Sequence, residues 1–389
     1  MTKRRLFLLI LILAIPLFLR AEGGKAKYVF YFIGDGMGIN HVTLGEYWSA
    51  YNQGAWGSFP LNFSAFESIG FASSFSASNL ITDSAAGGTA LATGEKTNNG
   101  MLAIASDSTT ILKSVATAAS ENGFRVGITT TVGLNHATPA AFYSHNINRE
   151  NYYQIASEIC TSNFEFFAGG GIIDYKGKHN YKKSIYKDIE KSGYTIAFGL
   201  DEYHQIMENR PEKILMVQKD INVNSFTPAL RATKNDMQQK DLISSAIEFL
   251  YTEDGTGFFL MSESGMIDWF SHGNRGMEVA AEVLSLAEAV DVALSFYNEH
   301  PDETLIVVTA DHETGGLSLA DDSGYHIYFD KWTKDPASDS DAHIGWTTSA
   351  HSAANVPIFA IGVNSELFRG RMDNTDIPKK ICEAMGITL

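Results

Sequence analysis

Residues 27–38 read KYVFYFIGDGMG, an unbroken apolar run followed by a glycine-rich turn that carries Asp35. A strand that is apolar at every position is buried on both faces, which is typical of parallel sheets. Four further runs share this character: FRVGITTTV at 124–132, GFFLMSE at 257–263, ETLIVVTA at 303–310 and VPIFAIG at 356–362. They alternate with stretches of helical spacing at 108–122, 239–251 and 277–300. The sequence therefore predicts an α/β fold, with a mostly parallel central sheet and helices on both faces.

Length and composition limit the classes of protein that this chain can represent. Its 389 residues, 44% hydrophobic and 19% charged, exclude a disordered chain. A formal net charge of −16 argues against a nucleic-acid-binding surface. The two cysteines, Cys160 and Cys382, are too few for a thiolate metal site, and whether they pair is left open. No linker divides residues 25–389, so we expect one domain, with the Lys- and Asp-rich stretch 175–237 at its periphery.

The N-terminus has the pattern of a secretory signal peptide, which we assign to residues 1–21. Basic residues at positions 3–5 precede an apolar run at 6–19, and the small residue Ala21 follows. The run is shorter than the ~20 residues that span a bilayer. Arg20 beside the expected cleavage point is atypical, which keeps an uncleaved anchor as the alternative. We expect a periplasmic or secreted mature protein with no stable membrane anchor.

Carboxylates and imidazoles stand where the apolar runs end, or just before one begins. The residues concerned are Asp35, Glu263, Asp268, His272, Asp311, His312 and His351. Ligands of open α/β sheets gather at the carboxyl ends of the strands, and these side chains are ligands for divalent ions. Asp268 and His272 are four residues apart and would share one face of a helix. Asp311 and His312 can reach one ion only where their strand has already ended.

Residues 79–94, NLITDSAAGGTALATG, place Ser84 at the start of a helix-competent stretch of small residues. Asp83 or Ser84 could simply cap this helix. The free N–H groups of a helix start also attract an anion, and a metal bound to the Ser84 oxygen would activate it as a nucleophile. Nucleotide binding is disfavoured. The segment GDGMGIN lacks the third glycine of a dinucleotide fingerprint, and Glu95 interrupts the P-loop-like GGTALATGEKT.

Five segments, in order, resemble the alkaline phosphatase family. They are TDSAAGGTALATGEKTNNG, HATPAAFYSHNINRE, ESGMIDWFSHGN, TADHETGG and SAHSAANVPIFAIG. The resemblance implies the three-layer sandwich of that family. It also implies hydrolysis of small phosphate monoesters to an alcohol and inorganic phosphate, through a phosphoserine intermediate and with two zinc ions and one magnesium. Family members are often dimeric, so a homodimer is left open.

The resemblance implies a role for each matched residue. Ser84 is the nucleophile, Arg149 clamps the phosphate and Asp83 orients Arg149. The implied ligands are Asp268, His272 and His351 for one zinc, Asp35, Asp311 and His312 for the second, and Asp35, Thr138 and Glu263 for magnesium. His136 stands where family members carry Asp or His beside the magnesium, so the third ion could also be zinc.

Two positions depart from the pattern of some members. Trp269 stands where they use Lys or His near the phosphate, and Thr314 replaces a second-shell His.

Four ligand carboxylates against three divalent ions leave a charge of +6 − 4 = +2, which suits a phosphomonoester dianion better than a diester. The alternatives are a phosphodiesterase or phosphomutase of the same superfamily and a non-catalytic metal- or phosphate-binding protein. A sulfatase is disfavoured because its x-Pro-x-Arg motif is missing.

Overall fold

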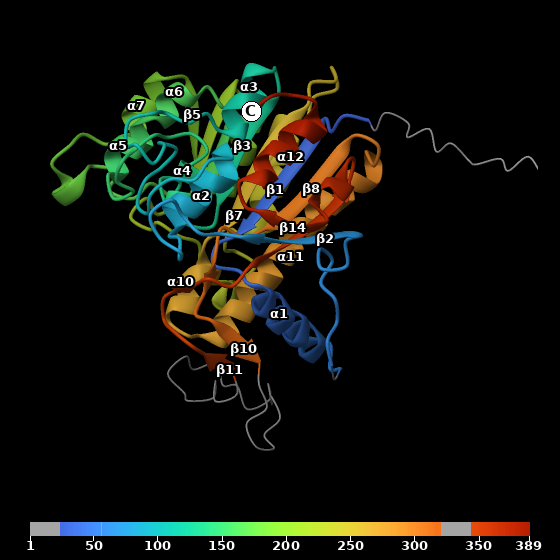
Figure 1. Cartoon of the computed structure of the whole chain (residues 1–389). Coiled ribbons are helices and arrows are strands. Elements are labelled where there is room, and N and C mark those ends of the chain that lie inside the picture. Colours follow the sequence, from blue (N-terminus) through green and yellow to red (C-terminus); the bar gives the residue numbers. More distant parts are fainter. Residues whose placement is uncertain (1–23, 56, 320–343) are drawn as a thin grey trace, which may run out of the picture.

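A ten-stranded sheet runs through the computed structural model, which describes residues 24–55, 57–319 and 344–389. The strand order is β14-β2-β13-β8-β1-β7-β3-β4-β6-β5 (Figure 1). The predicted signal peptide at 1–21 lies outside the described residues. The predicted mostly parallel sheet with helices on both faces is confirmed.

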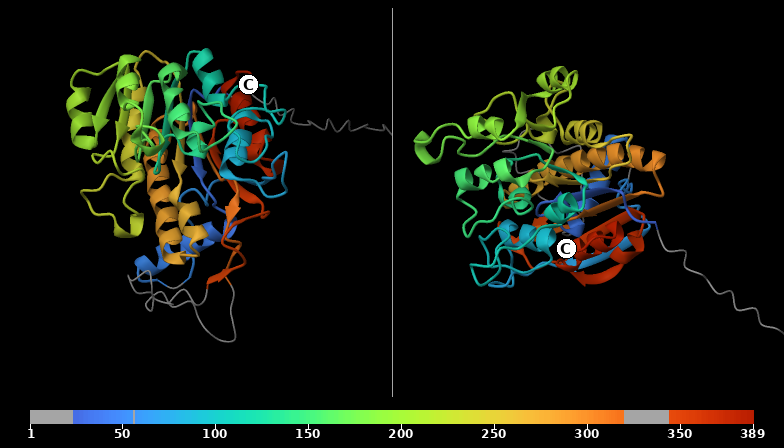
Figure 2. Two further views of the ribbon diagram at one scale, coloured as in Figure 1. Left: turned by 90° about the vertical axis from the view of Figure 1, so that its left-hand side faces the viewer. Right: turned by 90° about the horizontal axis from the view of Figure 1, so that it is seen from above.

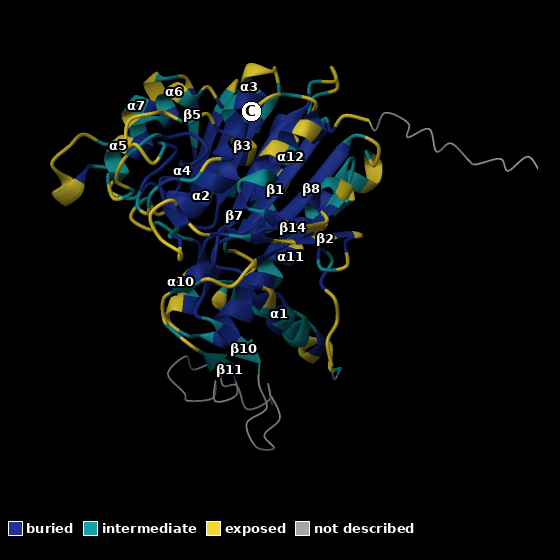
Figure 3. Ribbon diagram, in the orientation of Figure 1, coloured by how far each residue is buried: buried dark blue, intermediate teal, exposed yellow. Residues whose placement is uncertain are grey.

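The five apolar runs form the middle of this sheet, as predicted. They are β1 (Tyr28–Gly34), β3 (Arg125–Thr130), β7 (Phe258–Ser264), β8 (Thr304–Thr309) and β13 (Val356–Gly362). Every residue of β1, β7 and β8 is buried, and Figure 3 shows them as a continuous dark-blue core. The other strands are β2 (Ser68–Ser73), β4 (Phe166–Gly169), β5 (Tyr194–Phe198), β6 (Lys213–Val217) and β14 (Gly370–Asp373).

Strand β13 runs opposite to its neighbours. It pairs antiparallel with both β8 and β2, whereas the other pairs in the described sheet are parallel. The start of β13 therefore lies at the edge where β1, β7 and β8 end. His351, five residues before Val356, reaches the same edge as Asp35 and Asp311 for this reason.

Helices cover both faces of the sheet, as the views in Figure 2 show. One face carries α9 (Gln239–Leu250) and α11 (Gly276–Glu299), which confirm the helices predicted at 239–251 and 277–300. The other carries α2 (Ser84–Thr93), α3 (Val115–Glu121), α4 (Ala137–Ala140) and α12 (Asp376–Met385). The predicted helix at 108–122 is wrong in its first half. Ser114 caps the helix by accepting a hydrogen bond from Thr117 N, and Asp107 holds the preceding residues in a turn.

The stretch 175–237 extends the sheet at one edge. Its strands β6 and β5 follow β4 in the strand order, and α7 (Tyr186–Lys191) and α8 (Leu200–Met207) pack beside them. The remaining elements are α1 (Ile39–Asn52), α5 (Tyr152–Ser157), α6 (Ile159–Ser162), α10 (Met266–His272), β9 (Glu313–Thr314), β10 (Leu317–Leu319), β11 (Ile344–Trp346), β12 (His351–Ser352) and the short helices η1 (Lys178–Asn180), η2 (Ala229–Arg231) and η5 (Ser365–Phe368).

Two further observations bear on the sequence predictions. Cys160 and Cys382 are both unpaired. Among the described residues, no helix combines the length and the apolar character needed to cross a bilayer.

Candidate active site

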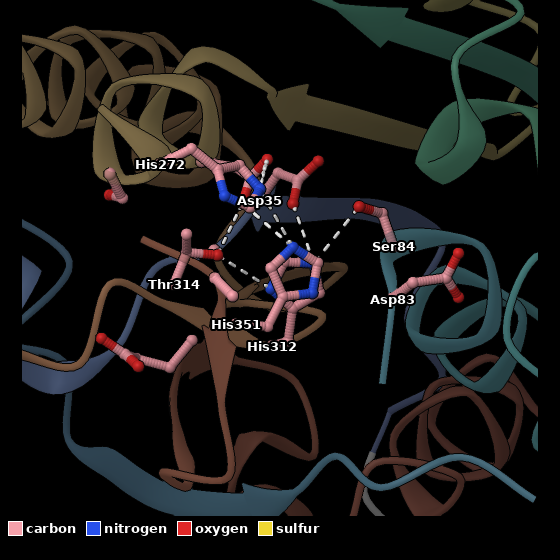
Figure 4. A network of polar contacts seen from close by, with 12 residues as sticks. Asp35, Asp83, Ser84, His272, His312, Thr314 and His351 are labelled. Carbon is pink, nitrogen blue, oxygen red and sulfur yellow. Dashed lines mark hydrogen bonds and ion pairs between the residues drawn. The ribbon is translucent and has the colours of Figure 1, made fainter. Parts of the chain in front are cut away.

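The residues singled out in the sequence converge at the carboxyl edge of the sheet. Asp35 follows β1, Glu263 lies at the end of β7, and Asp311 follows β8. The start of α2 brings Ser84 to the same place, and Figure 4 shows its hydroxyl directed at the imidazoles. Three groups of side chains there have ligand atoms within 4.8 Å of one another. They match the three predicted sets, apart from Thr138, and His136 takes part in the third.

The inner cluster consists of Asp35, Asp311 and His312, all fully buried. His312 Nε2 lies 3.3 Å from Asp35 Oδ1 and 3.4 Å from Asp311 Oδ2. The adjacent pair can reach one point because β8 ends at Thr309, as the sequence required. Both oxygens of Asp35 are buried without a hydrogen-bond partner. The inner cluster therefore buries carboxyl groups away from water, with no partner for Asp35 among the described residues that would stabilise its ionised form.

The outer cluster consists of Asp268, His272 and His351. Asp268 and His272 share one face of α10, as their spacing predicts, and Asp268 Oδ2 lies 3.4 Å from His272 Nε2. Backbone carbonyls accept hydrogen bonds from the Nδ1 atoms of both imidazoles, Ser349 O at 2.7 Å from His272 and Thr82 O at 2.8 Å from His351. The two Nε2 atoms then face each other at 3.2 Å. A carbonyl can only accept, so each Nδ1 carries a proton, and once its other proton is displaced each Nε2 offers a lone pair to a cation.

A third group joins Asp35 to His136 and Glu263. Thr130 donates its hydroxyl hydrogen bond to Glu263 Oε2, while Glu263 Oε1 and His136 Nδ1 are buried without partners. Thr138, on α4, places its Oγ1 3.3 Å from Asp311 Oδ2. The predicted residues of the third site thus lie together, with oxygen and nitrogen atoms free to bind an ion.

The electrostatics of these groups fit bound cations. Burial and the neighbouring carboxylates raise the pKa of Asp35 well above its usual value. Burial and the charge of Asp268 raise the pKa of Asp311 to about 8, and burial raises the pKa of Glu263 to about 7. Two carboxylates ~4 Å apart repel by about 4 kcal/mol at an effective dielectric constant of ~20. Divalent ions would remove this repulsion, so the residues present fit the metal sites that the sequence implies.

Ser84 stands at the first position of α2, with its hydroxyl 3.2 Å from His312 Nε2. Asp83 caps the helix by accepting a hydrogen bond from Ala86 N. The helix packs closely on the inner cluster, because a Cβ at Gly87 would lie 2.9 Å from the carbonyl oxygen of Asp311. The N-terminal end of α2 therefore directs both the serine hydroxyl and the positive end of the helix dipole into the site.

Arg149 reaches the site from the segment that follows α4. Its Nη1 donates a 3.1 Å hydrogen bond to Asp83 Oδ2, which also accepts from Gly100 N. Its Nη2 lies 3.3 Å from His136 Nε2. Burial and the charge of Arg149 lower the pKa of His136 to about 3, so this imidazole is neutral. Asp83 and Arg149 are thus paired as the sequence resemblance implied.

Some contacts of the site could not be anticipated from the sequence. The backbone carbonyls of Thr82 and Ser349 orient the outer histidines. Every residue has such a carbonyl, so the residue type cannot predict this contact. Thr130 was not singled out, although it lies at the end of a predicted strand beside Glu263.

The fold and the site together define an enzyme of the α/β class that works with divalent ions at the carboxyl edge of its sheet. The alkaline phosphatase family model matches residues 26–172, 228–335 and 329–387. The chain belongs to the alkaline phosphatase family, and it is a phosphomonoesterase. The stretch between the first two matched ranges contains α7, β5, α8 and β6, at the edge of the sheet.

Relatives and solved structures agree with this assignment. Alkaline phosphatase 3 of Bacillus subtilis is 28% identical over an alignment of 426 positions, which includes 93% of this chain and 89% of the relative. The structure of alkaline phosphatase from the Antarctic bacterium TAB5 has a TM-score of 0.79 at 30% identity, covering 95% of this chain and 100% of that chain. The cold-active alkaline phosphatase of a Shewanella species has a TM-score of 0.79 at 28% identity, covering 92% and 99%.

Proposed function

We propose that this protein hydrolyses phosphate monoesters through a phosphoserine formed on Ser84, with two zinc ions and one magnesium bound. The observation that carries this proposal is the position of the Ser84 hydroxyl. It is buried at the N-terminus of α2, 3.2 Å from His312 Nε2 and beside buried carboxyl groups, of which Asp35 has no hydrogen-bond partner in the described part of the chain. A serine that served only as a helix cap would have no use for these neighbours, and Asp83 already caps α2.

Each proposed ion has a set of protein ligands. The outer cluster would hold one zinc, the inner cluster the second, and Asp35, Glu263 and Thr138 the magnesium, beside His136. When bound, these ions supply positive charge that favours the ionised serine and the negative oxygens of the transferring phosphoryl group. Phosphoryl transfer passes through a loose in-line transition state, so positioning and charge stabilisation carry most of the catalysis.

In the first half-reaction the Ser84 Oγ attacks phosphorus, and the bond between phosphorus and the ester oxygen breaks. The hydroxyl proton of Ser84 ends, through solvent, on the departing alcohol. Arg149 binds two phosphate oxygens through its planar fork, a geometry that a lysine does not offer. Asp83 fixes the direction of that fork through the 3.1 Å hydrogen bond from Arg149 Nη1.

In the second half-reaction water attacks the phosphorus of phosphoserine, and the bond to Ser84 Oγ breaks. Ser84 recovers a proton from the water, and inorganic phosphate leaves. Throughout both steps the N–H groups at the start of α2 and the guanidinium of Arg149 face the negative oxygens. The groups that bind phosphate therefore stay in place while the nucleophile changes.

The charge of the site favours a monoester. The four proposed ligand carboxylates, set against three divalent ions, leave a charge of +2, and Asp83 offsets Arg149. A monoester dianion balances this charge, whereas a diester carries one negative charge and one more substituent. The phosphodiesterase of the same superfamily is disfavoured for this reason, whereas a phosphomutase, which also acts on monoesters, is distinguished by whether inorganic phosphate is released.

The decisive experiment compares hydrolysis rates of p-nitrophenyl phosphate, its diester and p-nitrophenyl sulfate, with zinc and magnesium measured on the same sample. We expect the monoester to react fastest and two zinc ions to be bound per chain. A faster diester, or full activity without bound metal, would reject the proposal.

Ser84→Ala tests the covalent step. Loss of the nucleophile of a catalytic unit costs turnover by roughly 10⁴-fold or more, whereas inorganic phosphate should still bind. The matched control is Ser245→Ala, a buried serine on α9 outside the site. Labelled phosphate trapped on the native chain at low pH, and absent from Ser84→Ala, would identify the phosphoserine. Unchanged turnover in Ser84→Ala would rule this intermediate out.

The mature protein is proposed to act in the periplasm or outside the cell. The support is the basic start and apolar run of residues 1–21. Expression of the full chain in a Gram-negative host, followed by N-terminal sequencing, tests it. We expect a new N-terminus near residue 21, while an intact N-terminus in the membrane fraction would favour an anchor.

A further inference from the structure

The hydroxyl of Thr314 contacts one ligand from each of the two proposed zinc sites. Its Oγ1 lies 2.5 Å from Asp268 Oδ1, in the outer cluster, and 3.2 Å from His312 Nδ1, in the inner cluster. Figure 4 shows these contacts converging on one buried side chain.

The backbone also ties Thr314 to both clusters. It lies on β9, where it pairs directly with His351 of β12, an outer ligand. Its N–H donates a 3.0 Å hydrogen bond to the carbonyl of Gly36, next to the inner ligand Asp35. Gly36 has φ of +74°, and a Cβ there would lie 2.8 Å from the Thr314 hydroxyl oxygen. The turn after β1 therefore leaves space for this hydroxyl.

The direction of each hydrogen bond follows from chemistry. The ionised Asp268 can only accept, so the single hydroxyl proton of Thr314 points at Asp268 Oδ1. The remaining lone pair of Thr314 then accepts from His312 Nδ1, which must carry the proton of the neutral ring. Nε2 of His312 is left with its lone pair directed toward Ser84 and Asp35, at 3.2 and 3.3 Å.

We propose that Thr314 is a positioning residue that couples the two zinc sites through one hydroxyl. It holds the Asp268 carboxylate in place for the outer zinc and fixes the His312 tautomer that the inner zinc requires. The inference rests on the proposed function, because it presumes that both clusters bind zinc. It goes beyond that function by making the affinities of the two sites depend on one side chain that binds neither ion.

The test measures zinc binding and uses no substrate. Thr314→Val keeps the shape of the side chain and removes the hydroxyl, while Thr314→Ser keeps the hydroxyl. Metal-free protein is dialysed against zinc buffered by chelators, and the bound zinc is counted. In Thr314→Val we expect both zinc-binding steps to weaken by about 10- to 100-fold, the usual cost of losing a residue that hydrogen-bonds to a metal ligand. Thr314→Ser should stay within a few-fold of the native protein.

Thr304→Val is the matched control. Its hydroxyl is buried on β8 without a partner, at the end of the strand opposite the metal clusters. Native-like zinc binding in this variant supports a specific role for Thr314. A loss at only one step in Thr314→Val, no loss at either step, or the same loss in Thr304→Val, would overturn the coupling.

A measurement on the native sequence guards against a variant that does not fold. In metal-free protein labelled with ¹⁵N-histidine, His312 should be the Nδ1–H tautomer, assigned by comparison with His312→Gln. An Nε2–H tautomer would overturn the proposal without any change at Thr314. If the native protein binds no zinc pair, the proposed function falls together with this inference. If it binds two zinc ions and Thr314→Val matches it, only the coupling fails.

Discussion

The inner and outer clusters use the same residue types in opposite proportions. The inner cluster has two carboxylates and one imidazole, and none of its side chains is exposed. The outer cluster has two imidazoles and one carboxylate, and 41% of the His272 side chain is exposed. The inner cluster is therefore both more buried and richer in carboxylates than the outer cluster, although the hydroxyl of Thr314 contacts both.

This difference bears on how tightly each cluster would bind an ion. In the inner cluster burial raises the pKa of Asp35 and Asp311, so ionised side chains there need a cation to be stable. In the outer cluster the hydrogen bond to Asp268 raises the pKa of His272 to about 9. The outer residues can thus neutralise one another without metal. On the proposed function, an ion in the inner cluster should therefore be held more tightly than one in the outer cluster.

Of the two clusters, the inner one should give the larger effect. Asp311→Asn removes a ligand charge that no neighbour can replace, and bound metal supplies several kcal/mol of charge stabilisation, so turnover should fall about 10³-fold or more. Added zinc should not restore it, which a rate measurement across zinc concentrations checks. Asp302→Asn, at an exposed position before β8, is the control. Recovery of Asp311→Asn at high zinc would show that the two clusters are equally replaceable.

The second prediction concerns the stability of metal-free protein. The pKa of Asp311, about 8, and of Glu263, about 7, lie above the unfolded values of about 4. The protonated carboxyls therefore favour the folded state, and this contribution is lost as the pH rises from about 4 through 8. Urea unfolding should show metal-free protein losing stability over this range, on the order of several kcal/mol.

Two comparisons check the origin of this pH dependence. The metal-loaded protein should not lose stability over the same range, because bound cations favour the ionised carboxylates. Metal-free Asp311→Asn should have a flatter profile than the metal-free native chain. An identical slope in the metal-free native and Asp311→Asn proteins would assign the effect to other groups.

Much of the fold could be predicted because its strands are buried on both faces. A run such as YVFYFI at 28–33 is apolar at every position, and this pattern located β1, β3, β7, β8 and β13 within a few residues. Spacing also predicted that Asp268 and His272 share a helix face. These features depend on local chain geometry, which a sequence records directly.

Features that depend on distant partners could not be predicted in this way. The antiparallel direction of β13 brings His351 to the site, yet the run VPIFAIG is as apolar as its parallel neighbours. The predicted helix at 108–122 started too early because Asp107 and Ser114 hold competing turn and cap contacts. The bridge made by Thr314 depends on a contact to Asp268, 46 positions earlier in the chain, so no spacing rule reveals it.

The third prediction concerns the outer cluster. His272→Gln removes one outer ligand at a partly exposed position, so zinc can still enter and leave. Losing a residue that only hydrogen-bonds to a metal ligand weakens metal binding by roughly 10- to 100-fold. Losing the ligand His272 should raise the zinc concentration for half-maximal activity by at least as much, and saturating zinc should restore most turnover. His312→Gln, in the inner cluster, is the contrast and should not be restored. If both variants respond alike to zinc, burial does not separate the two sites.

The smallest expected effect lies at Asp83, which hydrogen-bonds to Arg149 and contacts neither cluster in the described hydrogen bonds. Asp83→Asn keeps polar atoms for capping α2 but removes the charge that orients Arg149. Hydrogen bonds to charged groups exceed neutral ones by about 1 kcal/mol, so kcat/KM for a monoester should fall roughly 5- to 10-fold. Zinc binding should not change.

A double-mutant cycle separates the two contacts of Asp83. If the carboxylate acts through Arg149, Asp83→Asn should have almost no effect in an Arg149→Ala background. If it acts by capping α2 and so placing Ser84, the two losses should multiply, because the contact to Ala86 N is independent of Arg149. The first result would mean that Asp83 and Arg149 bind phosphate together, independently of the inner and outer clusters. The second result would mean that Asp83 acts by positioning Ser84 beside the inner cluster, and not by orienting Arg149.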